Sequence, residues 1–147
     1  MTSLQAALGV AQLERLTESV RRKRALGWRY NELLAGAPGL TLPPVAAEYA
    51  ESIYWVYGVL LEDHVPFDAE AMMKRLAALH IGTRPFFWCM HEQPVLRRLG
   101  WFEGERYPVA ERMARRGFYL PSGMALRPEQ AKRAADAVRS ILVEATA

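Results

Sequence analysis

The residues best suited to chemistry stand together in one stretch, residues 82–94, which reads GTRPFFWCMHEQP. It contains the cation of Arg84, the chain's single cysteine, Cys89, and the imidazole of His91. A guanidinium can hold a carboxylate or phosphate in a planar two-point grip, and an imidazole can exchange a proton near neutral pH. The stretch therefore predicts a binding surface for an anionic ligand. The alternative is a buried strand that enters a turn, with Arg84 paired to a nearby acid.

Aromatic side chains follow this cation. Phe86, Phe87 and Trp88 come directly after Pro85 and offer flat apolar surfaces suited to stacking. A segment built only to connect two elements would not need rings, a cation and an imidazole together. This combination favours the binding interpretation.

The usual catalytic centres are not encoded. His64, His80, His91 and Cys89 do not cluster at the spacing of metal ligands, so no metal site is expected. Cys89 and His91 stand two residues apart without a third group to orient them as a nucleophile pair. The glycines are too dispersed to form a phosphate-binding loop. The chain thus carries binding groups and no recognisable catalytic residue.

Length and composition indicate one globular domain. The chain has 147 residues, of which 51% are hydrophobic and 24% charged, and its formal net charge is +3. These values are typical of a folded water-soluble protein and do not identify a polyanion binder. A single cysteine allows no internal disulfide, and neither a signal peptide nor an apolar run of about 20 residues is present. We expect a cytoplasmic protein without a membrane partner.

The elements that must position this stretch begin with a long helix over residues 1–36. Apolar residues recur there at three- and four-residue steps, Thr2 is the expected N-cap and Gly36 the stop signal. Gly9 and Gly27 each weaken the helix by roughly 1 kcal/mol relative to alanine, so either could mark a bend. A helix of this length would span about 50 Å, longer than the roughly 40 Å diameter of the domain. It should overhang the body or lie against something absent from this chain.

The remaining residues, 37–147, predict an α/β body of two or three short strands covered by helices. Strands are expected near residues 52–61, 83–87 and 118–120, and helices near residues 69–79, 93–99, 109–116 and from 128 onward. The whole chain is therefore expected to form a single domain. Basic residues between Arg15 and Arg29, close to Trp28 and Tyr30, would suit a nucleic acid, but a solvated helix face explains them as well. We expect no nucleic-acid partner.

Four segments, in this order and spacing, resemble one family, the DegT-type pyridoxal-phosphate-dependent sugar aminotransferases, and within it the GDP-perosamine synthase-like members. The first, residues 1–16, is similar to the helix that begins the C-terminal portion of the family. Residues 53–57 (IYWVY) are similar to a central strand, residues 82–94 to a TRPFF…MHxQP segment, and residues 119–123 (YLPSG) to a turn before the last helix. The resemblance implies the long helix and small domain of a fold-type I aminotransferase.

The resemblance also implies what is missing. In the family, pyridoxal phosphate and its Schiff-base lysine lie in a large N-terminal domain, and Lys23, Lys74 and Lys132 match none of its motifs. The chain alone is therefore expected to hold no catalytic residue and no cofactor, and to be inactive. Its expected partners are a missing N-terminal aminotransferase domain or a second copy, with a nucleotide sugar and glutamate as substrates of the complete enzyme. A fragment, a start codon assigned inside a longer gene, or a decayed gene would each produce such a sequence.

The family's small domain closes one side of the substrate cleft. By position, the resemblance implies substrate contacts for Arg84, Phe86, Phe87 and His91. Arg84 would hold a carboxylate or phosphate, the phenylalanines would pack against sugar or base, and His91 would bond a sugar hydroxyl. Cys89 departs from the family pattern, which has proline there. The alternative function is a non-enzymatic module that dimerises through the apolar stripe of the first helix.

Overall fold

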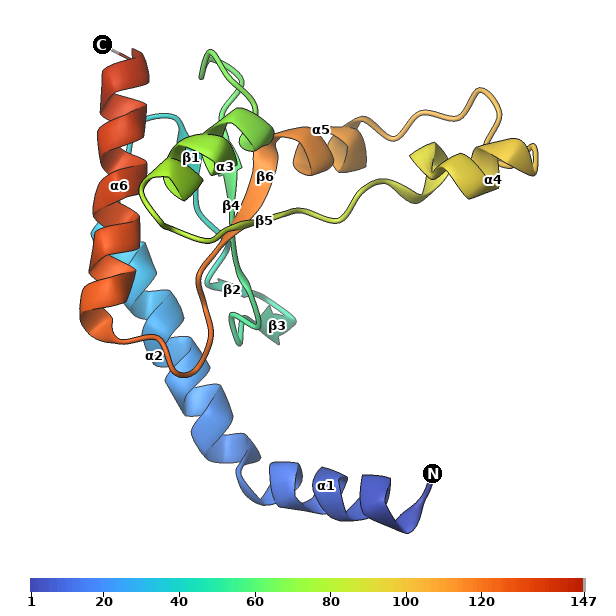
Figure 1. The fold of residues 1–147 in the computed structure, drawn as a ribbon, viewed down its shortest axis with the longest axis vertical. Helices are drawn as coiled ribbons and strands as arrows, with labels where there is room; N and C mark the ends of the chain where they lie inside the picture. Colours follow the sequence, from blue (N-terminus) through green and yellow to red (C-terminus); the bar gives the residue numbers. More distant parts are fainter. Residues whose placement is uncertain (147) are drawn as a thin grey trace.

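A four-stranded antiparallel sheet lies at the centre of the fold (Figure 1). The computed structural model describes residues 1–146. The strand order is β1-β4-β6-β5, formed by Leu40–Thr41, Tyr57–Leu61, Gly117–Leu120 and Arg84–Pro85. In the central pair Tyr57 faces Leu120, and at the edge Arg84 faces Tyr119. The mixed α/β class is confirmed, with more strands than the two or three that the sequence predicted.

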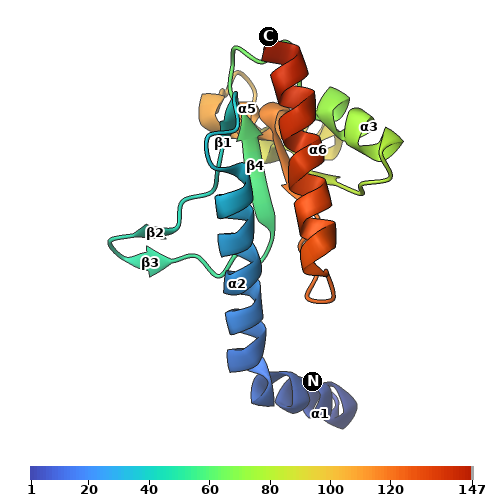
Figure 2. The same cartoon turned by 90° about the vertical axis from the view of Figure 1, so that its left-hand side faces the viewer.

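Helices α2 (Leu16–Leu34) and α6 (Pro128–Thr146) lie side by side over one face of this sheet (Figure 2). Helix α3 (Ala69–Ala78) contacts α6 and also α5 (Pro108–Arg116). Strand β4 alternates buried and half-buried residues, as a strand with one covered face should. Burial of each large side chain of this core contributes about 1.5–3 kcal/mol. The fully buried large residues are Tyr30, Leu34, Tyr57, Val59, Leu61, Met72, Leu76, Phe118, Val138 and Leu142.

The long helix expected over residues 1–36 is divided at Arg15. Helix α1 spans Ser3–Glu14, with the expected capping box at Thr2, and α2 follows at a sharp angle (Figure 1). Arg15 has φ −104° and ψ 4°, and its N–H bonds to the Gln12 carbonyl at 3.2 Å. The single-helix prediction was wrong because only α2 has a packed face. Helix α1 buries none of its residues, so nothing holds it in line with α2.

The expected strand over residues 52–61 is also shorter, since only β4 forms. Tyr54 adopts φ 50°, a left-handed conformation that a strand cannot contain. Its ring lies on α2, where a Cβ added to Gly27 would stand 2.2 Å from the Tyr54 ring. A small hairpin that the sequence did not predict, β2 (Ala46–Ala47) with β3 (Ala50–Glu51), precedes β4. The strand predicted at 83–87 is reduced to β5.

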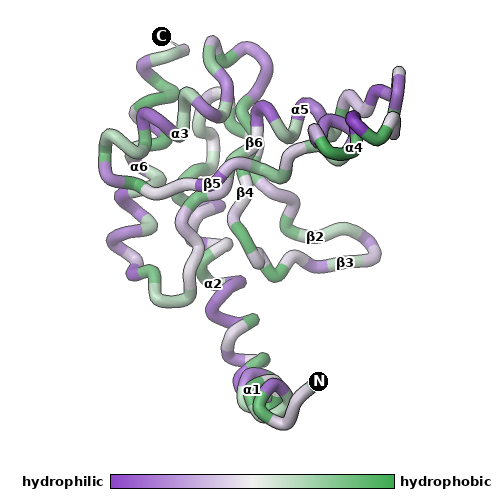
Figure 3. Tube along the Cα trace, turned by 45° about the vertical axis from the view of Figure 1, so that its right-hand side comes forward, coloured by the Kyte–Doolittle hydropathy of each residue, from purple (hydrophilic) through white to green (hydrophobic). Residues whose placement is uncertain are grey.

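Residues 87–107 project from the body between β5 and α5, and we call them the arm (Figures 1 and 3). The arm contains a 3₁₀ turn, η1 (Met90–Glu92), and the expected short helix, α4 (Pro94–Arg98). Several of its large apolar side chains are exposed, and Figure 3 shows strongly hydrophobic positions around α4. They include Phe87, Trp88, Met90, Val95, Leu99 and Trp101. Residue 147, the last of the predicted body, lies outside the described residues.

Candidate functional site

Arg84 stands on the edge strand of the sheet beside an open hollow of about 740 Å³. Its side chain is exposed, and it makes no hydrogen bond or ion pair with any other residue among 1–146. The hollow is lined by Val56, Gly82, Thr83, Arg84, Pro85, Tyr119, Leu120, Pro121 and Ser122. A cation on a largely apolar wall of this kind can receive a carboxylate or a phosphate. The sequence-based alternative, in which Arg84 pairs with an acid of the described chain, is not what the structure has.

The two phenylalanines after Pro85 differ in their surroundings. Phe86 is half-buried against the sheet, and a Cβ added to Gly117 would lie 2.2 Å from its ring. Phe87 is 72% exposed. Both rings contact Tyr119, with centroid distances of 4.8 Å for Phe86 and 6.0 Å for Phe87. Phe86 therefore anchors the start of the arm, and Phe87 offers a ring to solvent.

His91 lies apart from this hollow. It belongs to η1, is only 7% exposed, and lines a second, polar hollow of about 560 Å³ between the arm and α5. Its Nε2 stands 3.1 Å from Glu111 Oε1. The structure thus gathers Arg84, Phe86 and Phe87 around Tyr119 and places His91 apart from them, in η1 of the arm. Its predicted contact with a sugar hydroxyl stays a prediction.

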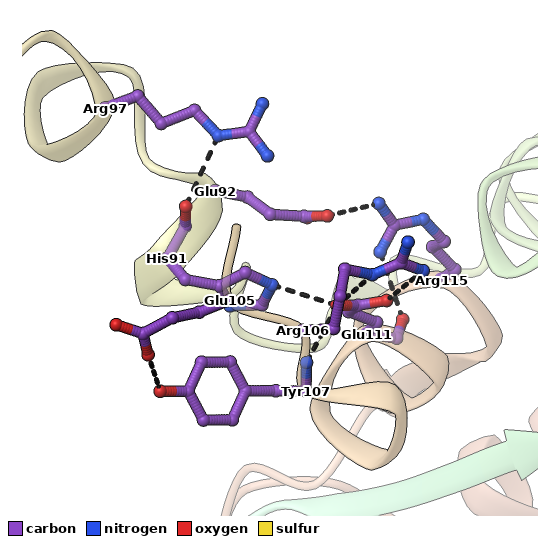
Figure 4. Close-up of polar contacts among 8 residues, drawn as sticks. All are labelled: His91, Glu92, Arg97, Glu105, Arg106, Tyr107, Glu111 and Arg115. Atoms are coloured by element: carbon purple, nitrogen blue, oxygen red, sulfur yellow. Dashed lines mark hydrogen bonds and ion pairs between the residues drawn. The ribbon is translucent and has the colours of Figure 1, made fainter. Parts of the chain in front are cut away.

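Glu111, on α5, is the centre of the contacts in the polar hollow (Figure 4). The Tyr107 N–H donates to its Oε1 at 2.9 Å, and Arg106 Nη2 donates to its Oε2 at 3.2 Å. These donors, first the Tyr107 backbone and then the Arg106 guanidinium, lower the pKa of Glu111 to about 2. Glu111 is therefore ionised at neutral pH.

One turn further along α5, Arg115 forms a second attachment to the arm. Its Nη2 donates to Glu92 Oε1 at 2.6 Å, and its guanidinium lies 5.2 Å from the Trp88 ring centroid. Sequence reasoning missed Glu111, Arg115 and Tyr119 as members of the site. The available signal was the four-residue spacing of Glu111 and Arg115, which puts both on one face of a helix.

Cys89 is buried between these attachments. Burial raises the pKa of its thiol, and the nearby Glu92 carboxylate raises it further. Thiolate chemistry depends on a lowered pKa. The environment of Cys89 is therefore that of a packed side chain and not of a nucleophile.

The three lysines do not fit the role of an aldimine lysine for pyridoxal phosphate. Lys23 Nζ donates to the carbonyls of Trp55 (2.6 Å) and Ser122 (2.5 Å), which ties α2 to the loops before β4 and after β6. Lys74 pairs with Glu70 and Lys132 with Asp136 on the surfaces of their own helices. Lys23 lines a hollow of about 240 Å³, but its amine is engaged by the two carbonyls. Each of the three amines already has a partner in the chain, so no catalytic step through this group is assigned to the chain.

The basic face of α2 is largely occupied by contacts within the protein. Arg21 pairs with Glu18, Arg24 pairs with Glu51, and Arg22 donates to the Met124 carbonyl at 2.7 Å. These contacts favour the interpretation of a structural helix face over that of a phosphate-binding surface. Among residues 1–146, no helix combines the length and apolar character needed to cross a bilayer.

Comparison with known proteins identifies the group to which this fold and these motifs belong. The model of the DegT/DnrJ/EryC1/StrS aminotransferase family matches residues 1–139. The chain belongs to this family, as the four sequence segments predicted.

Its relatives include GDP-perosamine synthases. The chain is 30% identical over 140 residues to that of Vibrio cholerae and 33% identical over 144 residues to that of Caulobacter vibrioides. These alignments cover 95% and 97% of this chain, but 37% and 38% of the relatives. The chain thus spans little more than a third of the length of the curated relatives it matches.

Solved structures of aminotransferases are also similar to this chain. The aminotransferase TlmJ from Streptoalloteichus hindustanus is similar with a TM-score of 0.81 and 30% identity, over 97% of this chain and 37% of that protein. DesV of S. venezuelae, solved with a ketimine intermediate, gives a TM-score of 0.79 and 31% identity, over 94% and 36% of the two chains. The described residues therefore have the fold of one portion of a sugar aminotransferase.

Proposed function

We propose that this chain is the C-terminal portion of a pyridoxal-phosphate-dependent nucleotide-sugar aminotransferase and forms one wall of its substrate site. In the complete enzyme an amino group passes from glutamate to a 4-keto-6-deoxy sugar nucleotide. The observation that carries the proposal is Arg84, an exposed cation on a sheet edge without a partner among residues 1–146. GDP-perosamine synthases among the relatives support the substrate class.

In this proposal the side chains of the wall have separate roles. Arg84 holds the carboxylate of the amino donor or a phosphate of the nucleotide sugar. The exposed Phe87 ring packs against sugar or base, while Phe86 fixes the backbone between them through its contact with Tyr119. His91 bonds a sugar hydroxyl from the polar hollow. None of these residues performs the amino transfer, so the chain binds no cofactor and does not transaminate on its own.

The test is complementation. We would co-express the chain with the N-terminal two-thirds of the Caulobacter vibrioides GDP-perosamine synthase and measure cofactor absorbance and amino transfer. Restored activity is expected. Failure of the two pieces to restore either signal, when both are folded, would count against the proposal.

Arg84→Gln sharpens the test. Loss of a charge-assisted contact of about 1.5–3 kcal/mol should raise KM for one of the two substrates about 10- to 100-fold. Arg98→Gln is the matched control, because Arg98 is an exposed arginine of α4 outside both hollows. An unchanged KM for both substrates in Arg84→Gln would remove Arg84 from the site.

A second candidate function, a non-enzymatic dimerisation module, is favoured by the exposed apolar residues of α1. Leu4, Leu8 and Leu13 are 73%, 60% and 67% exposed, and α1 buries no residue. Sedimentation should then show a dimer that Leu8→Asp dissociates and Leu8→Met preserves. A wild-type monomer at every accessible concentration would exclude this candidate.

A further inference from the structure

The environment of Glu111 determines which group is the donor in its hydrogen bond with His91. Its carboxylate accepts from the Tyr107 N–H and from Arg106, and these donors lower its pKa to about 2. An ionised carboxylate has no proton to donate. The short contact of 3.1 Å between Glu111 Oε1 and His91 Nε2 is therefore a hydrogen bond in which Nε2–H is the donor (Figure 4).

The ring of His91 is held in this orientation by its packing. The residue is 7% exposed, and the Tyr107 ring lies 4.9 Å away, tilted by 58°. The Arg97 Nε donates to the His91 carbonyl at 3.3 Å and fixes the backbone beneath the ring. A ring flip would move Nε2 away from Glu111 and lose the charge-assisted bond.

The other ring nitrogen of His91, Nδ1, has no hydrogen-bond partner among residues 1–146. It is also not one of the fully buried unpartnered side-chain atoms of these residues, which are Arg24 Nε and Glu92 Oε2. Nδ1 therefore keeps some accessible surface. In a neutral imidazole that carries its proton on Nε2, Nδ1 is a hydrogen-bond acceptor.

We propose that Glu111 is a positioning residue that holds His91 in the Nε2–H tautomer, so that Nδ1 is presented as an acceptor to a ligand hydroxyl at the polar hollow. The ligand class is a polyhydroxylated group, the sugar of a nucleotide sugar, and this part rests on the proposed function. Glu111 acts through His91 and does not touch the ligand itself.

Helix α5 also connects His91, which carries the acceptor Nδ1, to the central sheet. Glu111 and Arg115 lie on α5, and α5 leads directly into β6, the strand that carries Tyr119. Through these two side chains the arm is attached at His91, Arg106, Tyr107 and Glu92. The orientation of His91 is thus set by the same helix and strand that support the wall around Arg84.

The tautomer is measured directly by ¹⁵N spectra of the imidazoles of the intact chain, recorded where the rings are neutral. The chain has three histidines, so His64→Gln and His80→Gln assign the signals. His91 is expected to give a single Nε2–H signature. An Nδ1–H signature, or a mixture of tautomers, overturns the proposal.

Glu111→Gln tests the cause. A neutral amide can donate as well as accept, so the single signature should become a mixture. Glu103→Gln, an exposed carboxylate of the arm, is the control and should leave the signature unchanged. A folded Glu111→Gln variant that keeps the wild-type tautomer overturns the role of Glu111, and if this variant does not fold, the wild-type signature still decides.

The ligand is tested with a GDP-linked hexose against GDP alone. A shift of the His91 Nδ1 signal with the hexose conjugate, and none with GDP, supports the acceptor role. No shift with either probe, with the tautomer intact, overturns the sugar contact of His91 in the proposed function and leaves the tautomer assignment standing. The two failures are therefore distinguishable.

Discussion

Replacing Gly27 by alanine has two opposite effects on stability, one through helix propensity and one through packing. Gly27 lies inside α2 in an ordinary helical conformation. Helix propensity alone favours alanine over glycine there by about 1 kcal/mol. If propensity decided the outcome, the free energy of unfolding would rise.

The packing predicts the opposite sign. A Cβ at Gly27 would lie 2.2 Å from Tyr54 Cγ and 2.3 Å from Cδ2. Tyr54 is 4% exposed, and its hydroxyl accepts a hydrogen bond from Asn31 Nδ2 at 2.9 Å. Displacing a packed ring costs about 1–3 kcal/mol, and loss of the hydrogen bond about 1 kcal/mol more. Subtracting the gain in propensity, about 1 kcal/mol, leaves a net destabilisation of about 2 kcal/mol.

Urea unfolding followed by circular dichroism measures this difference. The midpoint of Gly27→Ala should fall without a change in slope. Gly9→Ala is the control, because nothing lies within 4 Å of a Cβ placed there, and it should increase helicity without lowering the midpoint. A Gly27→Ala variant more stable than wild type by about 1 kcal/mol would refute the packing argument.

Two further predictions concern stability. Arg116 donates to the carbonyls of Phe67 (2.7 Å) and Val65 (3.0 Å), and also to those of Leu61 and Glu62. Arg116→Ala should therefore lower the free energy of unfolding by about 3 kcal/mol. The control Arg98→Ala removes an exposed side chain and should change the free energy of unfolding by less than about 0.5 kcal/mol. Equal effects in urea would contradict this reasoning. Because the pKa of Glu111 is lowered from 4.5 to about 2, its contribution to stability is complete above about pH 4.5 and is lost as the pH falls toward 2. A pH series of unfolding midpoints should show this decline, and Glu111→Gln should lack it.

Local signals in the sequence predicted much of the fold. The N-cap at Thr2 and the helices near residues 69–79 and 109–116 all lie where they were expected. The division at Arg15 was not predictable, because no helix-breaking residue stands there. It results from packing that α2 has and α1 lacks, which no local pattern records.

The candidate site was predicted in part. Arg84 and the aromatic residues were selected as candidates because their types are unusual together in one stretch. Glu111 and Tyr119 were missed because they come from other elements, and only the pairing of β5 with β6 and the attachment of the arm to α5 bring them close. His91 was assigned by type, whereas its hydrogen-bonded state depends on a carboxylate twenty residues away.

The pairing of α2 with α6 has a consequence for synthesis on the ribosome. On the order of 100 residues separate the two helices, which at 5–20 residues per second is roughly 5–20 s of translation. During that interval the core that contains Tyr30 and Leu34 is incomplete, since α6 supplies Val138 and Leu142 to it. The apolar α1 emerges earlier still. The yield of folded protein therefore depends on protection of the nascent chain between the synthesis of α2 and that of α6. Co-expressed chaperones or slower initiation should raise this yield more than substitutions that stabilise the folded core.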